Sequence, residues 1–290
     1  MGKITSLIEI KGKVGNLVGY TGKDGHNVVR KHNWSPKNAK STLQMRRRTA
    51  WANLVNMWKA IAPYMVPSFE GKPQAQSDYN AFMQANIDID PVFLKKKEAR
   101  MGVCVAAPVT LCSGSLSPVS VSLMSGGKMR SDIALGDLTI DNETTVSAFS
   151  KAVINNNPAY EEGDQITGLL VNQVLEGENQ IPRVQVNCTK IVLDNTSNAL
   201  LLEEVSIDCF KSSDGYLSTN STVNGGVAWV HSRIVDGKTV VSPAQLVVNN
   251  SLLDTYQSAT AQNEAMASYG CKGSRYLTPG SKRYVAGASF

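Results

Sequence analysis

The sequence has few charged residues and no long hydrophobic run. Only 18% of its 290 residues are charged, whereas 42% are hydrophobic, which is enough to bury a core and excludes a wholly disordered chain. No stretch approaches the roughly 18 consecutive apolar residues of a membrane-spanning helix. Residues 1–13 alternate in polarity and carry four charges, so we expect neither a signal peptide nor a membrane-spanning segment.

Signatures of catalysis are also missing. The chain contains no GxSxG, HExxH, protein-kinase or dinucleotide-binding motif. The stretch Gly22–His26 lacks the GxxxxGK[ST] spacing of a phosphate-binding loop and is typical of a turn between strands. The adjacent acids Glu161-Glu162 and Glu203-Glu204 would point to opposite faces of a strand, which indicates solvated surface. We therefore expect no enzymatic activity, no catalytic residue and no cofactor.

Cysteine and histidine are too few and too scattered for a disulfide framework or a metal centre. The five cysteines are an odd number without CxxC spacing, so we expect small buried apolar side chains in a reducing compartment. The histidines are His26, His32 and His231, and none has a cysteine or acidic partner at the spacing of a metal site. We expect His231 to share a strand face with Trp229 as a hydrogen-bonded packing residue.

Positive charge is concentrated near the start of the chain. Residues 1–60 contain twelve Lys and Arg but two Asp and Glu, whereas residues 101–290 have a net charge of −5. This asymmetry predicts that the basic front meets an acidic partner. The candidates are nucleic acid, an anionic membrane and the acidic face of another protein. If that protein is a neighbouring copy of the chain, the assembly is head to tail.

Residues 1–36 are predicted to form a basic β-hairpin arm. The β-prone runs Gly15–Tyr20 and Asn27–Lys31 flank the turn-like stretch Thr21–Gly25. Because an isolated hairpin is only marginally stable in water, we expect this arm to lie on another surface.

Residues 37–100 are predicted to be a helical segment, which begins with the capping box Ser41-Thr-Leu-Gln44. Apolar residues then recur every three or four positions up to Pro63 and form one stripe. They are Trp51, Leu54, Val55, Trp58, Ile61 and Ala62. This pattern predicts a helix of about 22 residues, roughly 33 Å long, with three consecutive arginines in its first half. A second, shorter helix is expected to begin at Ser77-Asp78.

Eight short strands separated by turns are expected in residues 101–250, and they predict an Ig-like antiparallel β-sandwich. The expected strands are 103–111, 119–123, 144–153, 165–174, 183–193, 200–208, 226–235 and 239–248. The continuous apolar run Val227–Val230 is typical of a strand buried on both faces. Residues 251–290 are expected to form a C-terminal helix and tail. The predicted fold class is therefore α+β, with one sandwich favoured over two smaller ones.

Seven blocks of the sequence resemble motifs of a known family. They are Gly12–Gly22, Asn27–Arg30, Gln44–Arg48, Phe69–Pro73, Ser77–Phe82, Trp229–Arg233 and Gly237–Pro243. The family is an uncharacterised one found in Bacteroidota and their phages, including crAss-like phages. The resemblance covers about residues 10–90 well and the β-rich region loosely. The family has no established activity, so no catalytic residue is implied, but its phage members imply a structural role in the virion.

The resemblance and the charge asymmetry together predict a structural component of a tailed-phage virion, in a collar, neck ring, head decoration or fibre. We expect synthesis in the bacterial host cytoplasm, with further copies and portal, capsid or ring proteins as partners and no membrane. The residues expected at the subunit contact are Tyr20, Arg30, Arg46, Arg47 and Arg48. The residues expected to seat the first helix in the core are Trp51, Leu54 and Trp58. The alternative is a nucleic-acid-binding accessory protein that uses the basic N-terminal region.

Overall fold

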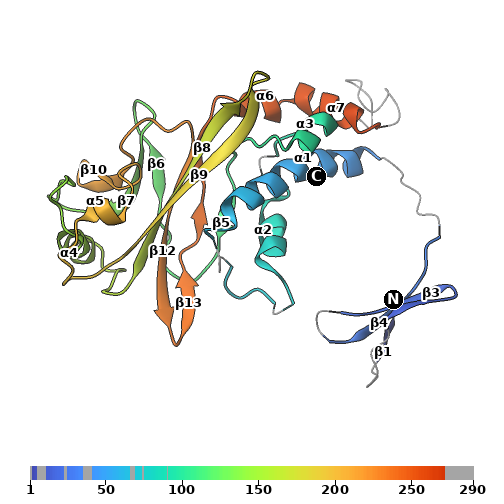
Figure 1. Cartoon of the computed structure of the whole chain (residues 1–290), viewed down its shortest axis with the longest axis horizontal. Helices are drawn as coiled ribbons and strands as arrows, with labels where there is room; N and C mark the ends of the chain where they lie inside the picture. Colours follow the sequence, from blue (N-terminus) through green and yellow to red (C-terminus); the bar gives the residue numbers. More distant parts are fainter. Residues whose placement is uncertain are drawn as a thin grey trace. The chain divides into compact units, whose positions relative to one another are not determined.

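The computed structural model describes residues 2–4, 11–22, 25–34, 41–65, 69–73, 75–89 and 91–271, with the backbone alone for residues 2–4. Within these residues the fold is mixed α/β and its sheets are antiparallel (Figure 1). The chain divides into two compact units, which are Met1–Lys40 with Pro73–Ser77 and Ser41–Lys72 with Asp78–Phe290. We call the first the N-terminal unit and the second the body. No described helix is both long and apolar enough to cross a membrane.

The N-terminal unit contains a four-stranded antiparallel sheet in the order β1-β4-β3-β2. Its strands are β1 (Gly2–Ile4), β2 (Gly12–Val14), β3 (Leu17–Thr21) and β4 (Asn27–Lys31). The turn between β2 and β3 places Gly15 at φ 55°, a left-handed conformation that suits glycine. Strands β3 and β4 pair with each other, β1 pairs with β4, and β2 pairs with β3. The sequence predicted a two-stranded hairpin here, and the structure has a four-stranded sheet. Three-residue strands such as β1 and β2 are too short to show a readable alternation.

Helix α1 (Thr42–Ile61) begins and ends where the sequence predicts. The Ser41 side chain accepts a hydrogen bond from the Gln44 amide (3.4 Å), and Pro63 follows the last turn. The buried residues of α1 are Met45, Thr49, Ala50, Asn53, Leu54, Met57 and Ile61. Trp51 is 41% exposed, which corrects the expectation that it seats the helix. Residues two positions apart lie about 200° around a helix, so burial of Asn53 turns Trp51 outward.

Two shorter helices follow α1. Helix α2 (Asp78–Asn86) begins where the second helix was expected, and α3 (Lys96–Met101) was not predicted because most of its residues are charged. Trp58 of α1 is half-buried against α2, with ring centroids 6.1 Å from Tyr79 and 5.2 Å from Phe82. These ring contacts hold the end of α1 against α2.

Residues 103–109 are buried except for Pro108, and they form no regular strand where the sequence predicts one. Buried amide side chains replace a neighbouring strand. Asn53 of α1 donates to the Val105 carbonyl (2.9 Å) and accepts from the Val105 amide (2.8 Å). Gln173 accepts from the Ala106 amide (2.8 Å). These side chains, together with single backbone bonds such as that from the Cys104 amide to the Pro182 carbonyl (2.9 Å), satisfy backbone groups without a ladder of strand pairing.

The body is built around a curled five-stranded antiparallel sheet, seen as β8, β9, β12 and β13 in Figure 1. The order is β13-β12-β8-β9, and β15 also pairs with β12. The strands are β8 (Gln165–Glu176), β9 (Ile181–Val192), β12 (Gly225–Val235), β13 (Lys238–Val241) and β15 (Val247–Asn249). Three of the expected strands coincide with β8, β9 and β12. Residues Val227–Val230 are all buried, as predicted for a strand covered on both faces.

The two faces of this sheet contribute to different cores. One core is shared with helix α4 (Val146–Asn156), and the sheet supplies Ile166, Leu170, Val227 and Trp229 to it. The other core is shared with α1 and α2, and the sheet supplies Leu169, Val171, Ala228 and Val230. Successive residues of a strand point to opposite faces, so the same strands serve both cores.

Smaller sheets complete the body. A four-stranded sheet in the order β10-β11-β7-β6 contributes to the core beside α4. Its strands are β6 (Val121–Leu123), β7 (Met129–Ala134), β10 (Lys211–Ser213) and β11 (Tyr216–Ser218). A two-stranded sheet pairs β5 (Thr110–Cys112) with β14 (Ala244–Gln245). The strand expected at 239–248 is thus divided among β13, β14 and β15.

Two of the expected strands are corrected to helices. Residues 144–153 form most of α4, and residues 200–208 contain α5 (Leu201–Glu204). Thr145 caps α4 by accepting a hydrogen bond from the Ala148 amide (3.2 Å). The core-facing residues of α4 recur at helical spacing and are Val146, Phe149 and Val153. With two helices and three sheets among the described residues of this region, the expected Ig-like sandwich is not confirmed.

The helix expected near residues 252–267 is divided into α6 (Leu253–Gln257) and α7 (Ala259–Ser268). Ser258 separates them because its backbone is extended and its side chain caps α7 by accepting from the Ala261 amide (3.1 Å). The tail expected after residue 271 lies outside the described residues.

Candidate functional site

Two of the residues expected at a subunit contact, Tyr20 and Arg30, lie on one face of the N-terminal sheet. In the antiparallel register Lys13 pairs with Val18, Val18 pairs with Arg30, and Tyr20 pairs with Val28. Directly paired residues share a face, and so do residues two positions apart on a strand. The side chains of Lys13, Val18, Tyr20, Val28 and Arg30 therefore form one surface, which we call the cationic face.

Trp34 extends the cationic face beyond the end of β4. The Lys13 ammonium lies 3.6 Å from the centroid of the Trp34 ring, a cation–π contact. The Trp34 Nε1 group donates a hydrogen bond to Asn16 Oδ1 (3.2 Å), yet the residue is 63% exposed. An exposed indole that is already held in place loses little side-chain entropy on binding, so Trp34 is a preformed contact element.

The opposite face of the N-terminal sheet carries exposed apolar side chains. Val14 and Leu17 pair with each other and are 77% and 49% exposed. Among the residues of this sheet whose side chains the structure describes, only Gly19, Asn27 and Val28 are buried. A sheet gains stability by packing a face against another layer. Much of both faces of this sheet is therefore available for contact with another surface.

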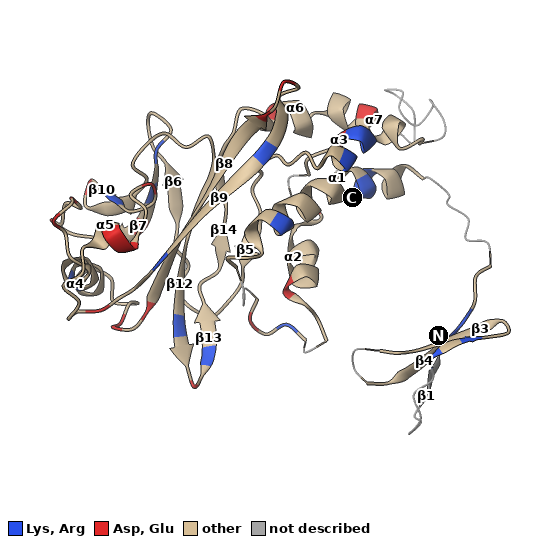
Figure 2. Ribbon diagram, viewed as in Figure 1, with Lys and Arg blue, Asp and Glu red and all other residues tan. Residues whose placement is uncertain are grey.

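Positive charge dominates the N-terminal unit. Residues 1–40 contain eight Lys and Arg against two Asp and Glu, a net charge of +6. Figure 2 shows some of these cations, in blue, on the sheet. Arg30 and Lys31 are exposed, and neither forms an ion pair with a described residue. The charges are thus available to an acidic partner.

The other three expected contact residues, Arg46, Arg47 and Arg48, lie on the first turns of α1 in the body. Arg47 and Arg48 are exposed, and Arg46 is partly buried. The first turn of α1 contains no acidic residue, so nothing there offsets the unfavourable interaction of cations with the positive end of the helix dipole. The structure thus places the expected contact residues in two groups, one on the cationic face and one on α1.

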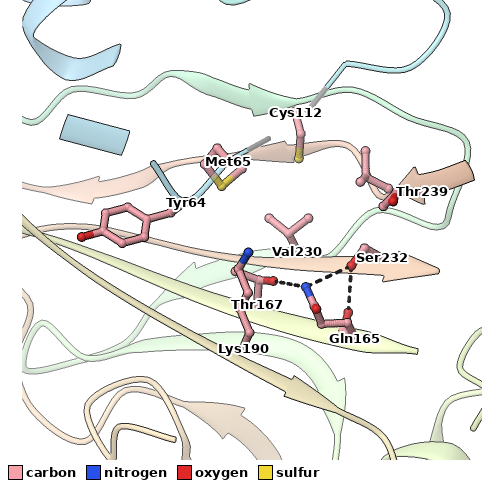
Figure 3. Close-up of a pocket in the computed structure, with 10 residues that line it drawn as sticks. Tyr64, Met65, Cys112, Gln165, Thr167, Lys190, Val230, Ser232 and Thr239 are labelled. Carbon is pink, nitrogen blue, oxygen red and sulfur yellow. Dashed lines mark hydrogen bonds between the residues drawn. The ribbon is translucent and has the colours of Figure 1, made fainter. Parts of the chain in front are cut away.

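A pocket opens on the face of the curled sheet that contributes to the core with α1 (Figure 3). Its floor is apolar and is formed by Met65, Cys112, Val230 and Val241. One wall is polar, because Gln165 Nε2 donates to Thr167 Oγ1 (3.1 Å) and to Ser232 Oγ (3.4 Å). The remaining lining residues are Tyr64, Lys190 and Thr239.

The cysteine of this pocket is a protonated thiol. Cys112 Sγ donates to the Ser242 carbonyl (3.0 Å), and burial raises the pKa of this thiol to about 12. Burial raises the pKa of Cys104 and Cys209 to about 12 as well. Thiols with so high a pKa stay protonated at neutral pH and are poor nucleophiles and poor metal ligands. These cysteines act as small buried side chains.

A buried ionic network lies on the opposite face of the curled sheet. His231 and Asp164 side chains are each 1% exposed, and His231 Nε2 lies 2.7 Å from Asp164 Oδ2. Arg233 donates from Nε to Asp164 Oδ1 (2.6 Å) and from Nη2 to Oδ2 (2.7 Å). Burial lowers the pKa of His231, against the opposing effect of Asp164. Burial acts to raise the pKa of Asp164, but hydrogen bonds from Arg233, the Glu161 amide and His231 bring it below its usual range.

The network links Asp164, which precedes β8, to β12. The His231 ring stacks on Tyr160 with centroids 4.2 Å apart. Within the described residues His231 Nδ1 is buried without a hydrogen-bond partner, so the ring activates no hydroxyl or thiol. His231 is therefore the hydrogen-bonded packing residue that the sequence predicts. Asp164 and Arg233 were not predicted, since no local pattern joins two residues so far apart in sequence.

No family model, curated protein or solved structure matches the chain. In the part of the chain that the structure describes, no group of three or more His, Cys, Asp and Glu side chains could hold a metal ion. The choice among the surfaces of this protein therefore rests on its structure. The cationic face is favoured as an interaction surface, because Arg30, Tyr20 and Trp34 are exposed and Trp34 is held in place by Lys13 and Asn16.

Proposed function

We propose that this chain is a structural subunit of a tailed-phage particle, in a collar, neck ring, head decoration or fibre, and that it acts by assembly between subunits. The observation that carries the proposal is the N-terminal sheet, whose two faces are exposed while the body has buried cores of its own. A small sheet with many exposed side chains on both faces is stabilised by binding a partner. The resemblance of Gly12–Gly22 and Asn27–Arg30 to a family with phage members supports a virion as the place of assembly.

In this proposal the cationic face supplies the subunit contact. Tyr20 and Trp34 provide rigid aromatic area, and Arg30 provides a planar group that binds carboxylates through two hydrogen bonds. The arginines at the start of α1 offer a second basic surface to portal, capsid or ring proteins. The body contributes bulk and shape rather than chemistry.

The proposal is tested by asking whether the chain is part of the particle. Mass spectrometry of purified particles of the encoding phage should detect the wild-type chain as a stoichiometric component. A variant without residues 2–34 should still fold, because the body has its own cores, but should be missing from the particles. Circular dichroism and thermal unfolding check the fold of the variant. If the wild-type chain is absent from washed particles, the proposal is wrong.

One observation favours a second function, the binding of single-stranded nucleic acid. Lys13, Tyr20, Arg30 and Trp34 combine cations and exposed rings at one sheet face, and single strands bind such surfaces through stacking and phosphate contacts. Affinity for an oligonucleotide would then fall steeply as salt is raised, because bound counterions are released. Gel shifts at two salt concentrations test this function, and no shift at the lower concentration would exclude it.

A further inference from the structure

We infer that the cationic face binds the acidic end of a second copy of this chain, so that copies associate head to tail. This inference rests on the proposed function and deepens it by naming the partner and its surface. The acidic end is the part of the body around α4 and α5. Its exposed carboxylates are Asp137, Asp141, Glu143, Glu203 and Glu204.

The backbone brings two parts of the acidic end side by side. The Leu201 amide at the start of α5 donates to the Thr144 carbonyl (2.8 Å), and the Val146 amide donates to the Ala199 carbonyl (2.9 Å). These bonds fix α5 beside the turn that carries Glu143. Figure 2 shows the acidic residues of α5 in red at this end of the body.

Charge at the acidic end is strongly unbalanced. Residues 137–156 and 194–208, which include α4 and α5, contain seven Asp and Glu but one Lys, a net charge of −6 in a chain whose total is +5. None of the five carboxylates of the acidic end forms an ion pair within the described residues. A concentration of uncompensated negative charge repels itself and attracts a cationic surface.

The cationic face has the complementary properties. Its unit has a net charge of +6, Arg30 forms no ion pair within the described residues, and Lys13 is held over the ring of Trp34. The sheet that carries it would also gain stability from a covering layer, which the acidic end of a second copy would supply. Charge complementarity sets the orientation of the contact and speeds the encounter, and the exposed Tyr20 and Trp34 add contact area.

Both halves of this complementarity lie in one polypeptide, so every copy offers one cationic face and one acidic end. Such a contact is heterologous and repeats from copy to copy. If the rotation angle from one copy to the next is a whole fraction of 360°, the copies close into a ring. Any other angle gives an open filament. A second copy is therefore the partner that the charge distribution of this chain fits.

The test uses two charge-reversed variants of the full-length protein. The first, Lys13→Glu/Arg30→Glu, reverses the cationic face, and the second, Glu143→Lys/Glu203→Lys, reverses the acidic end. Sedimentation velocity should show concentration-dependent oligomers for the wild type and about tenfold weaker association for each variant alone. An equimolar mixture of the two should regain association, because the reversed face of one then meets the reversed end of the other. Misfolding cannot produce this recovery.

A matched control reverses two acidic residues elsewhere, Glu178→Lys/Asp254→Lys, and should associate like the wild type. Three results overturn the inference. The first is association that is lost in the cationic-face variant but kept in the acidic-end variant, and the second is a mixture that stays dissociated. The third is a wild-type protein that remains monomeric at every concentration. This result overturns the inference even if the monomer binds an oligonucleotide. The content of purified particles is measured separately, so failure of this contact and failure of the virion role are distinguished.

Discussion

The body and the N-terminal unit use polar side chains in opposite ways. In the body, buried polar groups find partners inside the chain, as Asn53 does with Val105 and Asp164 does with Arg233. On the N-terminal sheet, charges and rings such as Arg30 and Trp34 remain exposed. The body is therefore stabilised from within, whereas the sheet leaves its charges and rings exposed, as the proposed subunit contact requires.

This difference has a measurable consequence. Substitutions that remove an internal partner in the body should lower the free energy of unfolding, and substitutions on the cationic face should lower association without changing unfolding of the body. The comparison would be wrong if substitutions on the cationic face also destabilised the body, or if removal of an internal partner left the free energy of unfolding unchanged. The three substitutions below run from the largest expected change in unfolding free energy to the smallest.

The largest change is expected for Asn53→Leu. The leucine fits a similar volume but removes both hydrogen bonds to Val105, which leaves a buried amide and a buried carbonyl without partners. Each orphaned group costs about 1–3 kcal/mol, so unfolding should be easier by about 4 kcal/mol. Urea denaturation followed by circular dichroism measures the change. Asn56→Leu is the control, since Asn56 is partly buried and donates one bond to the Val103 carbonyl (2.8 Å), and it should cost about 1 kcal/mol.

An equal loss of unfolding free energy in the two asparagine variants would contradict this account of residues 103–109. Such a result would mean that the segment is held by its apolar side chains alone and not by the Asn53 amide.

A change of about 3 kcal/mol is expected for Arg233→Met, because it leaves the Asp164 carboxylate buried without its cation. The control is Arg130→Met, which breaks an exposed pair with Asp214 (3.3 Å) and should cost less than about 1 kcal/mol. Urea denaturation at pH 7.5 should separate the two variants, and similar costs would mean that burial of Asp164 does not matter.

The Arg233 variant should also change how stability depends on pH. The pKa of His231 is lowered in the fold, so the wild type should lose stability as pH falls below about 6.5, where the unfolded histidine takes up a proton. The pKa of Asp164 is also lowered, so a second loss should follow below about pH 3.9. Without Arg233, burial raises the pKa of Asp164 and the carboxyl protonates in the fold. The difference between wild type and variant should therefore narrow as pH falls toward 4.

The parts of the fold that could be predicted are those with local signals. Helix α1 has a cap at Ser41, a repeating apolar stripe and a stop at Pro63, and strands β8, β9 and β12 are long enough for their apolar runs to be read. A strand was predicted where α4 lies, because valine, isoleucine and threonine favour strands. The apolar residues of α4 nevertheless recur at helical spacing. The strand expected at residues 103–109 failed for another reason, since Val105 and Ala106 bond to the side chains of Asn53 and Gln173, which lie about fifty residues or more away.

The residues of the candidate site also divide into those with a local signal in the sequence and those whose arrangement depends on distant residues. Tyr20 and Arg30 were identified from the charge pattern and the glycine-rich motif, but their shared face follows from the pairing register of β3 with β4. The contact of Lys13 with Trp34 joins residues on either side of two turns, so no pattern in the sequence announces it. Sequence reasoning therefore found members of the surface and missed the element that orders it.

The smallest change in unfolding is expected for Trp51→Ala, because Trp51 is 41% exposed and lies opposite the buried side of α1. Its loss should alter the free energy of unfolding by less than about 0.5 kcal/mol, in the range of ordinary surface substitutions. Trp58→Ala on the same helix is the matched comparison, since Trp58 packs on Tyr79 and Phe82 and should cost about 3 kcal/mol. A Trp51 variant that is destabilised as much as the Trp58 variant would show that this helix is seated by both tryptophans. It would also show that exposure does not separate the groups that stabilise the body from those proposed to meet a partner.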